Sequence, residues 1–249
     1  MPTGTLWIPT EDGRADAFVA FPDDGERHPG VLMYMDAFGL RPVLMGMARR
    51  LAEHGYHVLV PNLFHRGGPA PVVDLPEHIG ADVRHRLIER LRPMMAELTP
   101  EAALRDADAY LRFLTTRPEV SDGPVGVVGY CMGAVLAVRT AAARPDLVAA
   151  VAGFHPAALV TDAPDSPHLR IPSIRGSVHL GIAEGDMTEE ALERLAEALD
   201  ASDTEHTLEV YAGARHGYAM ADTDAFDGAA FQRHWERLLP LLDRALPQK

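Results

Sequence analysis

A cysteine between two glycines, placed after a strand-like segment and before a helix-like one, constrains this chain more than any other feature. Residues 129–133 read Gly-Tyr-Cys-Met-Gly; they follow the apolar run 124–128 and precede a helix-like stretch at 134–143. A strand, a tight Gly-x-nucleophile-x-Gly turn and a helix in this order form a nucleophile elbow. The glycines leave room for a strained turn, and the positive N-terminal end of the helix favours thiolate over thiol. The pattern therefore predicts a strand–turn–helix unit that presents Cys131 as a nucleophile.

The same cysteine also has a plainer interpretation. Cys131 is the only cysteine of the chain, and a single cysteine after a buried strand is often a small core residue. The five-residue match alone does not decide between the two interpretations. The strand before it, the helix after it and suitable partners further along the chain favour the nucleophile. A single cysteine also excludes an internal disulfide, as expected of a cytoplasmic protein.

Length and charge limit the classes of function. The 249 residues suit one large α/β domain, and we expect a single domain over residues 1–249. No apolar run approaches the roughly 18 residues of a membrane helix, and the N-terminus has no secretory signal pattern. The formal net charge of −13 argues against nucleic acid, because phosphate contacts need clustered Lys and Arg. We therefore expect a cytoplasmic monomer or small homo-oligomer whose partner is a small molecule, not nucleic acid or a membrane.

Strand-like and helix-like segments alternate along most of the chain. Strands are predicted at residues 5–8, 15–21, 30–35, 56–60, 124–128, 147–154, 173–183 and 207–211, and helices at 41–54, 77–98, 100–117, 134–143, 188–199 and 226–246. The first two strands read as an edge hairpin. The later strand–helix units predict an α/β fold with a mainly parallel central sheet and helices on both faces. Residues 64–98 interrupt this alternation and form either a cap over the site or a surface excursion.

A thiolate nucleophile needs a basic partner, and that partner needs an acid that orients it. His216 lies in a glycine-flanked loop between the last strand and the last helix, where an elbow protein carries its histidine. Asp186, just past the predicted strand 173–183, fits the place of the acid; Glu184 is the alternative. Asp186 would otherwise be an acidic residue at the start of the next helix. No Cys or His pair has the spacing of a zinc site, and we expect neither a metal nor a cofactor.

The remaining requirement is an oxyanion hole, which stabilises the charge that develops on the attacked carbonyl oxygen. The backbone N–H of Met132, the residue after the nucleophile, is one expected donor. The N–H of Ala37, in the loop after the predicted strand 30–35, is the second. Asp36 in the same loop is a carboxylate at a strand end, either a residue of the site or a cap for the next helix.

At this point the chain resembles the dienelactone hydrolase family of the α/β-hydrolase fold. Three motifs carry the resemblance: Asp-Ala-Phe-Gly at 36–39, Gly-Tyr-Cys-Met-Gly at 129–133 and Gly-Ala-Arg-His-Gly at 213–217. The similarity extends from about Gly13 to Leu242. It implies a single-domain α/β-hydrolase fold and, in the family, the opening of an enol-lactone ring.

The resemblance also implies roles for individual residues. Cys131 is expected to be the nucleophile, His216 the base and Asp186 the orienting acid. The expected reaction is hydrolysis of an activated lactone or ester through an acyl-cysteine intermediate. The alternative function is that of a non-catalytic protein that binds a small ligand on the same scaffold.

Two positions depart from the family pattern. The family carries glutamate where this chain has Asp36, and an arginine that binds the substrate carboxylate where it has Met220. Methionine does not replace a planar guanidinium, so the resemblance favours a less anionic or larger substrate than the dienelactone. Substitutes for the missing arginine are Arg215, Arg84 and Arg86. The residues expected to contact substrate or modulate the thiol are Asp36, Phe38, Tyr130, Arg215 and Met220.

Overall fold

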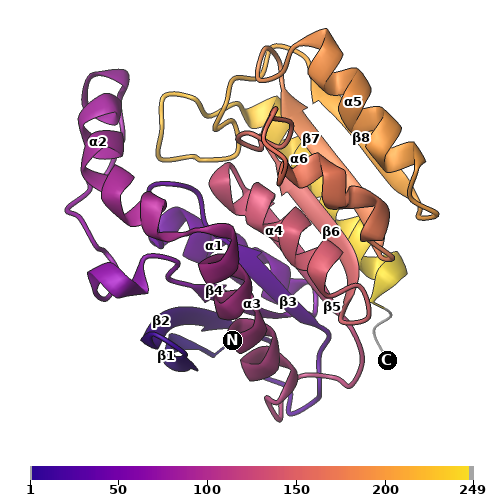
Figure 1. Ribbon diagram of the computed structural model, residues 1–249. Coiled ribbons are helices and arrows are strands. Elements are labelled where there is room, and N and C mark those ends of the chain that lie inside the picture. The colour runs from indigo at the N-terminus through magenta and orange to yellow at the C-terminus, as the bar shows by residue number, and fades with distance from the viewer. Residues whose placement is uncertain (1, 247–249) are drawn as a thin grey trace. The chain divides into compact units, whose positions relative to one another are not determined.

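The computed structural model describes residues 2–246 (Figure 1). Met1 and residues 247–249, which belong to the expected domain 1–249, lie outside the described residues. The chain forms two compact units. The first contains residues 2–123 and 222–224, and the second residues 124–221 and 225–246. The single-domain organisation stays a prediction.

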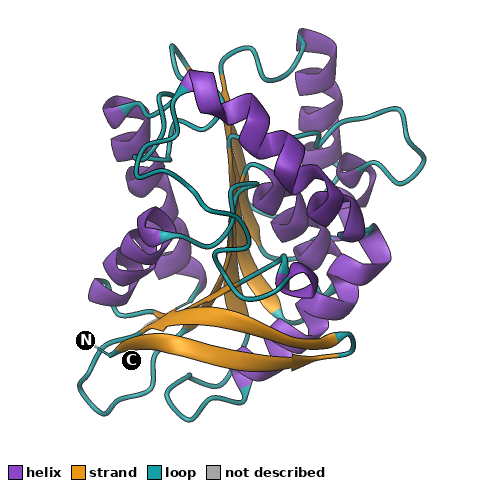
Figure 2. Ribbon diagram, turned by 90° about the vertical axis from the view of Figure 1, so that its left-hand side faces the viewer, coloured by secondary structure: helices purple, strands orange, loops and turns teal. Residues whose placement is uncertain are grey.

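The first unit contains four strands in the order β1-β2-β4-β3. β1 (Thr3–Thr10) and β2 (Gly13–Ala20) form the expected hairpin, paired in antiparallel register from Thr3 opposite Ala20 to Thr10 opposite Gly13. Figure 2 shows these two strands as one long hairpin. β2 is antiparallel to β4 (His57–Pro61), and β4 is parallel to β3 (Gly30–Tyr34). The fully buried β3 therefore ends at the loop that contains the Asp-Ala-Phe-Gly motif.

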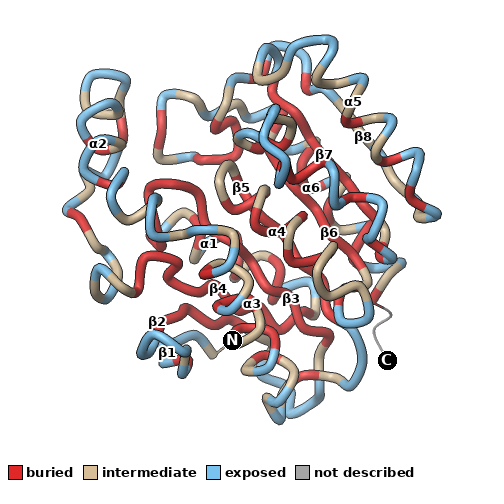
Figure 3. Tube along the Cα trace, viewed as in Figure 1, coloured by how far each residue is buried: buried red, intermediate tan, exposed pale blue. Residues whose placement is uncertain are grey.

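Three α-helices of the first unit follow these strands. α1 (Pro42–Glu53) packs against β4 and β2, and α3 (Pro100–Thr115) packs against β1 and β3. α2 (Ala81–Glu97) is different, because only Leu87 and Leu91 are buried along its length. Figure 3 shows its surface as mostly exposed or half-buried. The two interpretations of this segment, cap or surface excursion, therefore both stay open.

The second unit contains four parallel strands in the order β5-β6-β7-β8. They are β5 (Val125–Tyr130), β6 (Val148–Phe154), β7 (Ser177–Ala183) and β8 (His206–Tyr211). Helices α4 (Met132–Ala143), α5 (Glu189–Asp200) and α6 (Gly228–Ala245) complete the unit. Together with the parallel β3–β4 pair, these strands confirm an α/β fold with mainly parallel strands.

Neighbouring residues of β6 show that α4 and α6 cover opposite faces of these strands. A Cβ at Gly153 would lie 3.2 Å from the Cβ of Ala134 in α4. The next residue, Phe154, contacts His234 of α6, with ring centroids 4.1 Å apart. Successive side chains of a strand point to opposite faces, so each face has its own helix. Both faces are thereby shielded from water, which explains why β5 and β7 are almost wholly buried.

Several expected boundaries were wrong; for example, α2 begins at Ala81, not at residue 77, and β5 ends at Tyr130, not at residue 128. α4 begins at Met132, not at residue 134, so the helix starts directly after the cysteine. β7 begins at Ser177, not at residue 173, because residue 173 is the last residue of a 3-10 helix over 167–173. Within residues 2–246, no helix combines the length and apolar character needed to cross a membrane.

Candidate active site

The expected elbow is present in the second unit. β5 ends at Tyr130, α4 begins at Met132, and Cys131 between them has φ = 53°, the left-handed region that a residue with a side chain rarely occupies. A Cβ at Gly129 would overlap the carbonyl oxygen of Gly133, so the turn requires glycine there. The first N–H groups of α4 have no acceptor within the helix. The Met132 N–H is one of them and lies next to the sulfur-bearing residue.

Cys131, His216 and Asp186 form a continuous chain of polar contacts. The Cys131 Sγ lies 3.1 Å from His216 Nε2, and His216 Nδ1 lies 2.7 Å from Asp186 Oδ2. Cys131 is half-buried, and the side chains of His216 and Asp186 are 28% and 15% exposed. The sulfur is therefore neither sealed in the core nor fully exposed. The three side chains come from the carboxyl ends of β5, β7 and β8, where parallel strands place their functional residues.

Local turns fix the histidine and its acid. Gly213 and Gly217, on either side of His216, have φ values of 77° and 98°, which favour glycine. Asp186 follows a turn in which its own N–H donates to the carbonyl of Ala183. Asp186 is not the cap of α5, since the Thr188 side chain accepts from the Ala191 N–H.

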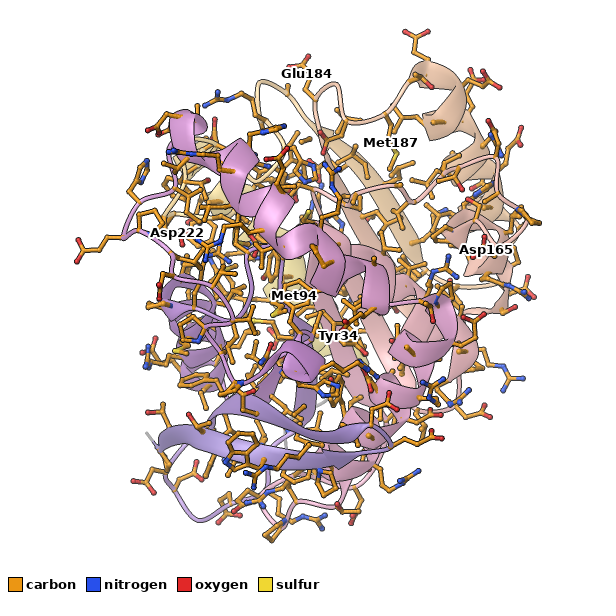
Figure 4. All side chains as sticks on the ribbon, turned by 60° about the vertical axis from the view of Figure 1, so that its left-hand side comes forward. Tyr34, Met94, Asp165, Glu184, Met187 and Asp222 are labelled. Carbon is orange, nitrogen blue, oxygen red and sulfur yellow. The ribbon has the colours of Figure 1, made fainter. Side chains whose placement is uncertain are left out.

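Glu184, the alternative acid, is used differently. Its Oε2 accepts from the backbone N–H of Gly213 at 2.7 Å. Figure 4 shows Glu184 on the outside of the structure, and its side chain is exposed. The geometry therefore pairs His216 with Asp186, while Glu184 holds the backbone of the loop that carries His216.

The surroundings of His216 favour its charged form. Burial disfavours the imidazolium, but the hydrogen bonds to Asp186 and Cys131, and the charges of these two groups, outweigh burial and raise the pKa of His216 to about 10. An imidazolium held beside a sulfur atom stabilises thiolate on that atom. The imidazolium of His216 is thus held 3.1 Å from the Cys131 sulfur.

Asp36 belongs to the first unit, and the structure excludes the helix-cap interpretation, whereas its role in the site stays a prediction. It does not cap α1, which begins six residues later at Pro42 and has no side-chain cap. The carboxylate instead accepts from the Phe38 N–H and forms an ion pair with the Arg41 guanidinium. Sequence reasoning missed Arg41, although it lies only five residues from Asp36. Asp222, the second acid bound to Arg41, is 181 residues away along the chain and gave no signal.

The other residues expected at the site have varied surroundings. The Tyr130 side chain is fully buried, with its hydroxyl 2.9 Å from His234 Nε2 of α6. The hydroxyl of Tyr130 is thus bound to α6, and a role of Tyr130 at the site stays a prediction. Met220 is buried and Arg215 is exposed.

Phe38 is buried between two arginines of the first unit. The guanidinium carbons of Arg41 and Arg84 lie 5.5 and 5.4 Å from its ring centroid, within reach of a cation–π contact. Arg86, two residues further along α2, is exposed. Of the two α2 arginines proposed as substitutes at Met220, Arg84 is therefore the one that contacts the Asp-Ala-Phe-Gly loop.

A second histidine, missed by sequence reasoning, packs against His216. The His155 ring is fully buried and meets the His216 ring edge-to-face, with centroids 5.3 Å apart. Tyr218 packs on His155 in the same way at 5.0 Å and donates its hydroxyl to the carbonyl of Gly181. His155 follows β6 directly, but a single histidine after a strand carries no recognisable spacing. These rings support the catalytic candidate from the side of the core.

The site contains no recognisable metal centre. Among residues 2–246, no group of three or more His, Cys, Asp or Glu side chains is arranged to hold a metal ion. The chemistry open to the described residues is that of a thiol, an imidazole and a carboxylate in line, next to a helix N-terminus. This combination on parallel strands defines the class: hydrolases of the α/β-hydrolase type, which attack a carbonyl carbon with an elbow nucleophile.

Comparison with known proteins identifies the family. The model of the dienelactone hydrolase family matches residues 15–246, and the chain belongs to this family. A carboxymethylenebutenolidase from a strain of Pseudomonas sp. is 26% identical over 235 residues, which cover 94% of this chain and 92% of the relative. The protein is accordingly a carboxylic ester hydrolase, and hydrolases of this family act on small ester or lactone substrates.

Solved structures show the same fold. The crystal structure of a protein described as a dienelactone hydrolase from Klebsiella pneumoniae superposes with a TM-score of 0.83 at 19% identity, and the match covers 98% of both chains. The dienelactone hydrolase from Anabaena variabilis has a TM-score of 0.66 at 18% identity, again over 98% of both chains. At these identities the likeness establishes the fold and leaves the substrate open.

Proposed function

We propose that this protein hydrolyses an activated lactone or ester through a Cys131–His216–Asp186 triad. The observation that carries the proposal is the unbroken chain of contacts from the Cys131 sulfur through His216 to Asp186. The raised pKa of His216 supports it, because an imidazolium at neutral pH is the natural counter-ion of a thiolate. Membership of a hydrolase family argues against the alternative of a non-catalytic ligand-binding protein.

The proposed reaction has two halves. In the first, the Cys131 thiolate attacks the carbonyl carbon; the bond to the leaving oxygen breaks, and His216 donates its proton to that oxygen. In the second, a water molecule gives a proton to His216 and attacks the thioester carbon. The carbon–sulfur bond then breaks, which releases the carboxylic acid and restores the thiolate–imidazolium pair. Every proton is returned, so no cofactor enters the balance.

Two backbone N–H groups are proposed to bind the oxyanion. The Met132 N–H lies in the first turn of α4, beside the nucleophile. The Ala37 N–H, predicted from the sequence as the second donor, lies in the first unit. Removal of one such donor costs about 3 kcal/mol of transition-state stabilisation in comparable sites.

The identity of the acid gives a direct test of the triad. Asp186→Asn should lower kcat about 10²-fold or more, because the imidazolium loses its charged partner and its fixed orientation. Glu184→Gln is the matched control, because it retains a side-chain oxygen that can accept from the Gly213 N–H. Steady-state rates with 4-nitrophenyl butyrate should therefore fall only slightly in Glu184→Gln. Equal losses in the two variants would show that Asp186 is not the orienting acid.

The substrate is expected to be uncharged near its acyl group. Met220 replaces the arginine that the family uses for a carboxylate, and its side chain is buried. A methionine side chain offers no donor to a carboxylate, so this position suits an apolar group better.

A matched pair of esters measures this preference. The kcat/KM for 4-nitrophenyl hexanoate should exceed that for mono-4-nitrophenyl adipate by about tenfold or more, because an unpaired carboxylate is costly to desolvate. Both esters have similar length and the same leaving group, and their uncatalysed rates serve as the control. Faster turnover of the adipate would show that the chain retains a cationic subsite, for which Arg84 is the first residue to vary.

A further inference from the structure

Every N–H group of the Arg41 guanidinium is used within the first unit. Two donate to the Asp36 carboxylate at 2.5 and 3.0 Å, and two donate to the Asp222 carboxylate at 2.6 and 3.2 Å. The fifth donates to the carbonyl oxygen of Gly39 at 3.2 Å. A guanidinium has five N–H groups, and the Arg41 side chain is only 4% exposed. Arg41 therefore has no N–H left to bind a substrate carboxylate while these contacts hold.

Three of the five Arg41 hydrogen bonds, the two to Asp36 and the one to Gly39, stabilise the turn at residues 36–39. Two further hydrogen bonds lie within the turn itself. The Gly39 N–H donates to the carbonyl of Asp36 at 3.1 Å, and the Phe38 N–H donates to the Asp36 carboxylate, also at 3.1 Å. Arg41 donates hydrogen bonds to both ends of the same turn, to the Asp36 carboxylate and to the Gly39 carbonyl. Gly39 has φ = 90°, so the turn has a shape that most residues would resist.

These hydrogen bonds leave one N–H of the turn unpaired. The N–H groups of Phe38 and Gly39 are used inside the turn, whereas in the described chain the Ala37 N–H has no hydrogen-bond acceptor. Ala37 is only 7% exposed, and a buried N–H without an acceptor is rare in native proteins. An unpaired buried donor in a rigid turn is what an oxyanion-binding group requires before substrate arrives.

The far side of the guanidinium is anchored as well. Asp222 (Figure 4) is held by its backbone, because its carbonyl accepts from the Ile79 N–H at 2.7 Å. Two residues on, the Asp224 carboxylate accepts from the Ala81 N–H at the first turn of α2, also at 2.7 Å. Arg41 therefore connects the 36–39 turn to the segment 222–224, which is itself held by hydrogen bonds to residues 79 and 81.

We propose that Arg41 is a positioning residue, which holds the 36–39 turn in the shape that presents the Ala37 N–H as an oxyanion donor. The inference rests on the proposed function, in which Ala37 supplies one of the two donors. It also gives Asp36 a different role from the one expected by resemblance. The Asp36 carboxylate is fixed by Arg41 and braces the turn, and activation of the thiol is left to His216.

Lysine at position 41 separates charge from geometry. It retains the positive charge but offers three N–H groups from a single nitrogen, so it cannot bind two carboxylates in parallel pairs and also reach Gly39. The matched control is Arg66→Lys. Arg66 is another arginine of the first unit that is held by two carboxylates, those of Asp12 and Asp106, and it has no contact with the 36–39 turn in the described hydrogen bonds.

The test compares Arg41→Lys, Arg66→Lys and the unchanged protein with 4-nitrophenyl butyrate. Both variants are expected to lose stability in urea unfolding. Only Arg41→Lys is expected to lower kcat, by about 10- to 100-fold, with KM changed less than about threefold, because a misplaced oxyanion donor weakens the transition state and not substrate binding. Equal kcat values in the two variants would overturn the positioning role.

A second readout distinguishes positioning from loss of stability. The thiolate adds to 1,1,1-trifluoro-2-octanone to give an oxyanion that resembles the transition state, whereas 2-octanol forms no such adduct. Arg41→Lys should raise the inhibition constant of the ketone about tenfold or more and leave that of the alcohol within about threefold. If Arg41→Lys does not fold, Asp36→Asn provides the same comparison, since it retains the acceptor for Phe38 and loses the charged pairing. An unchanged ketone-to-alcohol ratio in the folded variant would overturn the inference.

Cys131→Ala, assayed in parallel, separates this inference from the proposed function. Turnover that persists in Cys131→Ala contradicts the proposed function itself. Turnover that depends on Cys131, together with identical behaviour of Arg41→Lys and Arg66→Lys, contradicts only the positioning role.

Discussion

Alanine at position 131 should abolish hydrolysis of 4-nitrophenyl butyrate, with kcat/KM reduced at least about 10³-fold, because no other group replaces a covalent nucleophile. The fold should survive. Cys131 is half-buried, and its side chain is small, so its loss creates little cavity, and alanine tolerates the positive φ of the elbow as well as cysteine does. Circular dichroism and urea unfolding check the fold, and steady-state kinetics measures the activity.

Serine at the same position refines the result. Cys131→Ser should retain only slight activity, because His216 would then have to deprotonate a hydroxyl, a far weaker acid than a thiol. Undiminished turnover in Cys131→Ala would remove the nucleophile assignment, whatever Cys131→Ser does. Full activity in Cys131→Ser would show that thiolate formation is not what the site is built for.

Asparagine at position 216 should lower kcat/KM about 10²- to 10⁴-fold, the range that a general acid–base group contributes. The same change should slow alkylation of Cys131 by iodoacetamide near neutral pH, since the imidazolium that stabilises the thiolate is lost. His206→Asn is the matched control. His206 is the first residue of β8 in the same unit, and it pairs with Asp200, the last residue of α5. Equal alkylation rates in His216→Asn and the unchanged protein would contradict a thiolate–imidazolium pair.

The raised pKa of His216 makes the stability of the folded protein depend on pH. The pKa rises from 6.5 in the unfolded chain to about 10 in the folded one, so folding binds a proton between these values. The stabilisation that results is fully present below pH 6.5 and is lost as pH rises through about 10. The difference in unfolding free energy between the unchanged protein and His216→Asn should therefore shrink as pH is raised from 7 towards 10.

The sequence was most informative where local backbone geometry and chemistry coincide. The elbow was predictable, because a strand, two glycines around a nucleophile and a helix leave one local arrangement. His216 and Asp186 were predictable from chain order, since each follows a strand and the carboxyl ends of parallel strands share one edge. In the second unit, His216 lies 3.1 Å from the Cys131 sulfur and 2.7 Å from the Asp186 carboxylate, so the three side chains meet.

Prediction failed where a contact depends on residues far apart in the chain. The helix-cap interpretation of Asp36 was wrong: its carboxylate pairs with Arg41, and the arrangement is completed by Asp222, 181 residues beyond Arg41. No local pattern distinguishes a carboxylate that will meet an arginine from one that will cap a helix. The contact between Tyr130 and His234 of α6, 104 residues further along the chain, was likewise not predicted.

The starts of β7 and α4 were predicted wrongly because of local backbone structure that the sequence pattern did not show. The strand predicted over 173–183 begins later, at Ser177, because residue 173 is the last residue of a 3-10 helix. At the elbow, the glycine at 133 suggested a longer turn. The structure instead starts α4 at Met132, which places its first N–H groups next to the sulfur.

The central claim is that Cys131 carries the acyl group during turnover, and mass spectrometry of the acid-quenched enzyme tests it most directly. Mixing with excess 4-nitrophenyl butyrate for a fraction of one turnover should add the mass of one butyryl group to the peptide that contains Cys131. The adduct should be removed by hydroxylamine and should be missing in Cys131→Ala. A butyryl group on any other residue, or rapid turnover that leaves Cys131 unmodified at every quench time, would contradict the account.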